Sequence, residues 1–222
     1  MSARGVAAAG LVALAVLLAR PRAAAADPPS DRTLVIVGLG LALPTYAVGV
    51  VTHEGSHAIA AKLAGARIEE FRPWPGTSKH TGAFQLGLTR VSGLFGTKAR
   101  LAFYLAPKVA DLALLGAYVA YYRSGAYPDG SYGQLVVTVL ATGFWLDFAK
   151  DTIMWRRHND LVKAMNLMGA TDELRRFPIR LGFAVASAGL GYLVLQGHER
   201  LFASNDAPAT APRVLPVLQG AF

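Results

Sequence analysis

The sequence contains no cysteine, which excludes a disulfide framework, a thiolate metal site and a cysteine nucleophile. Histidine is also scarce, with five residues in a chain of 222. Any metal ion that the chain binds must therefore be held by histidine, aspartate or glutamate side chains. The few histidines are the first residues to consider for a site.

Charged residues are few as well, at 16% of the chain, whereas 53% of the residues are hydrophobic. This composition is too apolar for an ordinary soluble domain and predicts a protein that resides in the lipid bilayer. The formal net charge of +8 would suggest nucleic acid in a soluble protein. Here the basic residues lie in loops between apolar runs, the pattern that orients membrane proteins, so we expect no nucleic-acid partner.

Four apolar segments follow one another along the chain, at residues 33–65, 98–122, 134–155 and 180–196. Each is close to the roughly 20 residues that a helix needs to cross a bilayer. Residues 66–98 combine aromatic and β-branched residues with glycine and proline, which favours a small β-hairpin or a re-entrant loop. The sequence therefore predicts an all-α membrane protein with about four transmembrane helices and one such loop.

The two ends of the chain differ from this central part. Arg4 precedes a short apolar run, and the alanines at 24–26 form an A-x-A cleavage pattern. Residues 1–26 therefore predict a signal peptide or an uncleaved N-terminal anchor. Residues 199–222 are rich in alanine and proline and predict a flexible tail. Residues 27–198 are expected to form a single transmembrane domain.

Basic residues are concentrated in two loops, at 66–98 and 156–180. They are Arg67, Arg72, Lys79, Arg90, Lys98, Arg156, Arg157, Lys163, Arg175, Arg176 and Arg180. By the positive-inside rule both loops face the cytoplasm. We therefore expect an integral protein of the inner or plasma membrane of a bacterium, with its active site near the cytoplasmic side.

The first apolar segment ends in "VVTHEGSHAIAAKLAGA", which contains the pattern H-E-x-x-H. His53 and His57 are four residues apart, so they share a helix face and can offer two nitrogens to one ion. Glu54 can accept a proton from a water molecule that such an ion polarises, as in zinc metallopeptidases. Ionisable residues in a membrane segment are costly and mark function by default. The alternative is that they are polar residues at the membrane boundary, solvated by lipid headgroups.

This stretch, in its membrane context, resembles the site-2 protease family of intramembrane zinc metallopeptidases. The small residues after the second histidine match that family, and "LAPKVADL" places Pro107 comparably, with Ala106 where the family has glycine. The resemblance covers residues 33–168. It implies a Zn²⁺ cofactor, hydrolysis of membrane-embedded or membrane-proximal protein or peptide substrates with Glu54 as the catalytic residue, and a later aspartate as the third zinc ligand.

The family's D-G pair is absent, so three aspartates remain as candidates for the third ligand. Asp160, in "RRHNDLVKAMNLMG", precedes an amphipathic stretch and is the first choice, and its alternative role is to cap that helix. Asp147 and Asp151 lie four apart in "WLDFAKD" and are either ligands themselves or partners that hold the ligating imidazoles. Asp111 is interpreted as a polar contact between helices.

The other three histidines are weaker candidates. We expect His80 to be exposed to solvent, His158 to contact headgroups, and His198 to lie beyond the last helix, on the wrong side for this metal site. The alternative to an enzyme is a non-catalytic membrane protein, either with a structural metal site or as an inactive protease-like binder of membrane helices. A structural site needs the histidines but not Glu54. A diiron oxidase would need more histidines than the five present.

Overall fold

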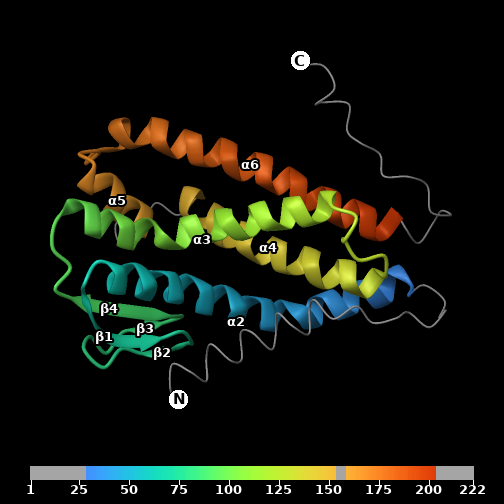
Figure 1. Ribbon diagram of the computed structural model, residues 1–222, viewed down its shortest axis with the longest axis horizontal. Helices are drawn as coiled ribbons and strands as arrows, with labels where there is room; N and C mark the ends of the chain where they lie inside the picture. The colour runs from blue at the N-terminus through green and yellow to red at the C-terminus, as the bar shows by residue number, and fades with distance from the viewer. Residues whose placement is uncertain (1–28, 154–158, 204–222) are drawn as a thin grey trace.

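The computed structural model of the protein describes residues 29–153 and 159–203 (Figure 1). The segment expected to be a signal peptide or anchor, residues 204–222 of the expected tail, and His158 lie outside the described residues. The described part forms five helices and four short strands. In chain order they are α2 (Asp31–Leu63), β1 (Arg67–Arg72), β2 (Gly76–Thr77), β3 (Phe84–Gln85), β4 (Leu88–Ser92), α3 (Thr97–Arg123), α4 (Ser131–Ile153), α5 (Asp160–Leu167) and α6 (Glu173–Ala203).

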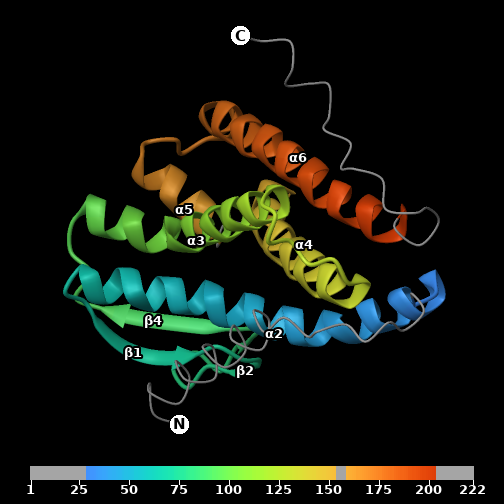
Figure 2. The ribbon, with the colours of Figure 1, turned by 45° about the vertical axis from the view of Figure 1, so that its right-hand side comes forward.

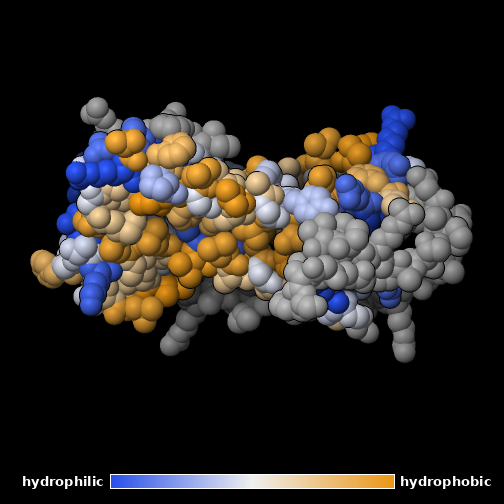
Figure 3. All heavy atoms as spheres, turned by 90° about the horizontal axis from the view of Figure 1, so that it is seen from above, coloured by the Kyte–Doolittle hydropathy of each residue, from blue (hydrophilic) through white to orange (hydrophobic). Residues whose placement is uncertain are grey.

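Four of these helices, α2, α3, α4 and α6, are long and apolar enough to cross a membrane. On the face that Figure 3 shows, apolar side chains cover most of the middle, and hydrophilic ones gather toward the ends. Leu39, Leu43 and Val185 expose 72%, 74% and 65% of their surface. An apolar surface of this extent is unfavourable in water and favourable in lipid. The prediction of an all-α membrane-spanning protein is therefore confirmed.

The helices form one bundle in which α4 packs against α2, α3 and α6, and α3 packs against α2 (Figure 1). Glycine allows close approach at two contacts of α4. A Cβ atom at Gly143 would lie 2.4 Å from Cγ2 of Thr45 in α2, and one at Gly191 of α6 would lie 2.8 Å from the Trp145 indole. Small residues at such contacts let membrane helices pack closely. These contacts hold α4 between α2 and α6.

Helix α2 has well-defined ends, which place its H-E-x-x-H motif inside regular helix. The Ser30 hydroxyl group accepts a hydrogen bond from the main-chain nitrogen of Thr33 at 3.2 Å and caps the first turn. The helix ends at Leu63, just before Gly65, whose φ of 75° is a conformation that glycine adopts without strain. His53 and His57 lie between these ends, one turn apart.

The chain between α2 and α3 forms a β-ribbon, residues 67–92. Its strands pair antiparallel in two ladders, β1 with β4 and β2 with β3, with a bulge in β1 between Ile68 and Glu70. The ribbon lies alongside the C-terminal half of α2 in two views (Figures 1 and 2). The predicted small β-hairpin is therefore confirmed, and it lies against the helix turns that carry the motif.

The ribbon and α5 lie at the same end of the bundle (Figure 1). These two elements belong to the two basic loops of the sequence, so the alternating direction of the helices brings both loops to one side. This is the arrangement that the positive-inside rule requires. Which face of the membrane this side occupies stays a prediction.

The last helix is longer than the apolar segment predicted for it. Helix α6 begins at Glu173 and ends at Ala203, whereas the apolar segment covers only 180–196. Its added turns mix charged residues such as Glu173 and Arg200 with apolar ones such as Leu174 and Leu201, so an apolar run alone does not mark them. The predicted position of His198 beyond the last helix was therefore wrong. His198 lies inside α6, and its Nε2 atom is 2.9 Å from the Thr142 hydroxyl of α4. The helix also extends past the boundary expected for the tail.

Candidate metal centre

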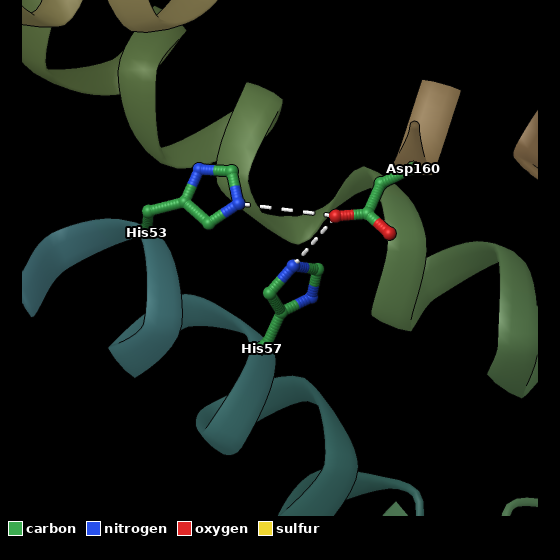
Figure 4. Close-up of side chains that lie close together, drawn as sticks. All are labelled: His53, His57 and Asp160. Atoms are coloured by element: carbon green, nitrogen blue, oxygen red, sulfur yellow. Dashed lines mark hydrogen bonds and ion pairs between the residues drawn. The ribbon is translucent and has the colours of Figure 1, made fainter. Parts of the chain in front are cut away.

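Three side chains from two distant parts of the chain meet at the end of the bundle that carries α5. His53 and His57 come from α2, and Asp160 comes from the first turn of α5 (Figure 4). One ligand atom from each lies within 4.8 Å of the others, a grouping that could hold a metal ion. The His57 residue is only 5% exposed. Of the aspartates predicted for the third position, the structure brings Asp160 to this point.

In each imidazole ring, the Nδ1 atom is hydrogen-bonded to another helix on the side of the ring away from Asp160. Nδ1 of His57 donates to the main-chain oxygen of Phe103 in α3 at 2.7 Å, and its Nε2 lies 3.1 Å from Oδ2 of Asp160. Nδ1 of His53 lies 2.9 Å from Oδ2 of Asp147 in α4, and its Nε2 is 3.8 Å from the same Asp160 oxygen. Each ring therefore turns its Nε2 atom toward Asp160.

These contacts suit a cation between the three side chains. The Phe103 carbonyl oxygen can only accept a hydrogen bond, so Nδ1 of His57 carries the proton and Nε2 presents its lone pair. The ionised Asp160 carboxylate that faces this lone pair is also only an acceptor. Two acceptors directed at each other need a proton or a metal ion between them. Two imidazole nitrogens and one carboxylate oxygen, with a fourth position open, form a common ligand set of catalytic zinc sites.

Asp160 is presented by a helix that another residue caps. The Asn159 side-chain oxygen accepts a hydrogen bond from the Leu161 nitrogen at 2.7 Å, so the alternative role of Asp160 as the cap is wrong. The Asp160 carboxylate points to the histidines and also accepts a bond from Lys163 at 2.9 Å. Burial raises the pKa of this carboxyl group, but its interactions with His53 and His57 outweigh burial and hold the pKa well below its ordinary value. This shift favours the ionised carboxylate, which is the form that binds a metal ion.

The other two candidate aspartates occupy positions behind the site. Asp147 is hydrogen-bonded to Nδ1 of His53 and forms an ion pair with Lys150. Asp151 is 2.9 Å from Nζ of Lys108 in α3 and accepts a hydrogen bond from the Asn159 amide at 2.7 Å. The holding role considered as the alternative to ligation thus fits the position of Asp147.

Lys108 is the residue that sequence reasoning missed. It is 3% exposed, and its ammonium group lies between Asp111 of its own helix and the two aspartates of α4. Asp111 therefore takes part in a contact between helices, as expected, both through this lysine and through Asp147. The available signal was a lysine inside the second apolar segment, where a charged side chain is costly and marks function by default.

Glu54 lies on the side of α2 that faces the ribbon. A Cβ atom added at Gly87 would lie 2.8 Å from both Cγ and Oε1 of Glu54, and the Thr89 hydroxyl donates to the Glu54 main-chain oxygen at 2.9 Å. The ribbon thus forms a wall along the glutamate that follows the first histidine. Among the other histidines, His80 is exposed, as predicted.

Comparison of the chain with protein-family models, with curated proteins and with solved structures gives no match. The chemistry of the site must therefore be argued from its own residues. They provide a grouping that could hold a metal ion, hydrogen bonds that fix both imidazoles, and a glutamate beside the first histidine.

Proposed function

We propose that this protein is a zinc-dependent intramembrane endopeptidase of the site-2 protease type. The observation that carries the proposal is the convergence of His53, His57 and Asp160 in a bundle of apolar helices. Glu54 follows the first histidine directly and completes the H-E-x-x-H pattern of zinc metallopeptidases. Ionisable side chains gathered in this way among membrane helices favour a catalytic or transport role over a structural one.

The mechanism assigns a task to each residue. His53 and His57 would hold a zinc ion through Nε2, because their Nδ1 atoms are engaged by Asp147 and Phe103. Such an ion would supply a Lewis acid for a water molecule and the scissile carbonyl group. The ionised Asp160 completes the protein ligands. Glu54 accepts the proton of the attacking water and delivers it to the leaving amine, the role of a general base and then a general acid.

The proposed substrate is a membrane protein or peptide, cleaved within or beside the bilayer. A helix keeps its peptide bonds hydrogen-bonded internally, so the substrate must unwind where it is cut. The β-ribbon supports this requirement, because the outer edges of a two-stranded sheet can pair with an extended chain and β4 lies along Glu54 through Thr89. We further propose that the site opens to the cytoplasm of a bacterium, and the basic residues around α5 and the ribbon support the cytoplasmic side.

Removal of zinc tests the proposal. The detergent-purified protein is incubated with a panel of synthetic single-span transmembrane peptides, and products are identified by mass spectrometry. We expect cleavage of at least one peptide, loss of cleavage when phenanthroline removes the zinc, and recovery when zinc is added back. The non-chelating isomer of phenanthroline is the matched control and should leave cleavage intact. Cleavage that continues in a zinc-free preparation would contradict the proposal.

A second prediction concerns the wall beside Glu54. Gly87→Ala places a Cβ atom 2.8 Å from Cγ and Oε1 of Glu54 and 2.8 Å from Cγ1 of Val50, so these side chains or the ribbon must move. A displacement of this size in a catalytic group can cost up to about a hundredfold in rate, so we expect kcat/KM to fall by about that factor while zinc content stays unchanged. The control is Leu86→Ala at the neighbouring residue, which is 58% exposed. Equal activity of the two variants would show that the ribbon does not position Glu54.

A further inference from the structure

Lys108 lies in an unusual environment for a residue in a membrane helix. Its Nζ atom is 3.3 Å from Oδ2 of Asp111 and 2.9 Å from Oδ2 of Asp151, and it donates to the main-chain oxygen of Asp147. These three partners match the three N–H groups of an ammonium. Buried ion pairs add little stability compared with apolar residues of the same shape. Stability alone therefore does not account for a cluster of one lysine and three aspartates in this bundle.

The cluster is connected to two of the three candidate ligands by separate chains of hydrogen bonds. The first arm runs from Lys108 to Asp147, whose Oδ2 atom is 3.5 Å from Nζ and 2.9 Å from Nδ1 of His53. This arm ends on the ring that offers the first ligand nitrogen.

The second arm runs to α5. Lys108 holds Oδ2 of Asp151, and Oδ1 of the same carboxylate accepts from the Asn159 amide nitrogen. The oxygen of that amide caps α5 through the nitrogen of Leu161, and Asp160 is the first residue of the helix. The Asn159 side chain thus uses both of its ends, one on α4 and one on α5. This connection links the start of α5, where Asp160 lies, to α4.

We propose that Lys108 is a positioning residue of the metal centre, whose ammonium group fixes His53 through Asp147 and the start of α5 through Asp151 and Asn159. The inference rests on the metal site of the proposed function and not on peptide hydrolysis. Asp111 is not independent of the arms, because its carboxylate interacts with Asp147 as well as with Lys108. Thr138 is the internal reference, because it is a fully buried polar residue of α4 that is hydrogen-bonded to the Tyr127 hydroxyl and lies on neither arm.

The test measures Zn²⁺ affinity by competition with a chelating dye, and the absorption spectrum of the Co²⁺-loaded protein, on full-length chains in detergent. Lys108→Met is expected to weaken Zn²⁺ binding about tenfold to a hundredfold, the usual effect of losing a residue that holds a ligand, and to change the Co²⁺ spectrum. Thr138→Val should bind Zn²⁺ within about threefold of the wild type and keep its spectrum, because this buried residue is hydrogen-bonded to Tyr127 and to neither arm. A purely structural role would change thermal stability in both variants without changing the spectrum.

A second variant keeps the test decisive if Lys108→Met does not fold. Asp151→Asn breaks only the second arm and leaves Lys108 paired with Asp111 and Asp147. It should also weaken Zn²⁺ binding, by about tenfold. Where both variants fold, Lys108→Met combined with Asp151→Asn should weaken binding by less than the product of the single effects, because the two residues act through one arm.

The outcomes separate this inference from the proposed function. Wild-type Zn²⁺ affinity in Lys108→Met or, where that variant does not fold, in Asp151→Asn overturns the inference and leaves the proposed peptidase intact. Equal weakening in Thr138→Val also overturns it, because a general loss of packing in the bundle, and not the arms, would then account for the effect. A Lys108-dependent metal site in a protein that cleaves no peptide supports the inference and contradicts the proposed function. A wild-type chain that binds neither Zn²⁺ nor Co²⁺ overturns both.

Discussion

The purified protein is expected to contain about one zinc ion per chain, and His57→Ala and Asp160→Ala are each expected to lose it. Each substitution leaves two of three ligand side chains, and the Nε2 atom of His57 lies only 3.1 Å from the carboxylate that completes the set. Asp147→Ala should keep zinc with about tenfold to hundredfold weaker affinity, because Asp147 only holds the His53 ring. Elemental mass spectrometry of the detergent-purified variants, normalised to protein, measures this directly.

Asp172→Ala is a suitable control, since this aspartate is exposed and pairs with Arg175 outside the site. The contrary result is also clear. Zinc that survives Asp160→Ala and disappears in Asp147→Ala would assign the third ligand position to Asp147, whose carboxylate is hydrogen-bonded to His53. A wild-type protein that takes up no transition metal when zinc is supplied would favour the non-catalytic alternative.

The membrane fold was predictable because lipid imposes a simple rule on sequence. A chain that crosses the bilayer must satisfy its own backbone and expose apolar side chains, so each spanning helix appears as an apolar run. The ends of the helices were harder to predict from the sequence, as α6 shows. Its terminal turns mix charged and apolar residues, and their helical structure depends on contacts such as the one between His198 and Thr142 and on the burial of Leu201.

The candidate site was predictable only where its residues are neighbours in sequence. His53 and His57 share a helix face by their spacing, which needs no knowledge of the fold. The third position depends on how α5 returns to α2, and the sequence left it open among Asp160, Asp147 and Asp151. The structure brings Asp160 to the histidines because the Asn159 cap, bonded to Asp151, anchors α5. Such a contact depends on packing between distant segments, which hydrophobic periodicity does not reveal.

Glu54→Gln is expected to abolish peptide cleavage while zinc content stays at the wild-type level. Glutamine has the shape of glutamate but cannot accept the proton of the attacking water, and losing a positioned general base costs about a hundredfold to ten-thousandfold in kcat. The fold should survive, because the contacts that hold this turn use the main-chain oxygen of Glu54 and its packing against Gly87, not the charge. The measurement pairs kcat on a cleaved transmembrane peptide with zinc content of the same preparation.

Measuring kcat and zinc content together on the Glu54 variants distinguishes an enzyme from a structural metal site. A structural site uses His53, His57 and Asp160 and is indifferent to Glu54, so it would show full zinc in wild type and variant and no cleavage in either. An enzyme that uses another base would cleave equally well with glutamine at this position, and that result would contradict the mechanism while leaving the zinc site in place. Glu54→Asp serves as the matched control, because it keeps the carboxylate but withdraws it by one methylene, so kcat should fall less than in Glu54→Gln. Only loss of cleavage with retained zinc, together with partial activity in Glu54→Asp, assigns the proton transfer to this carboxylate.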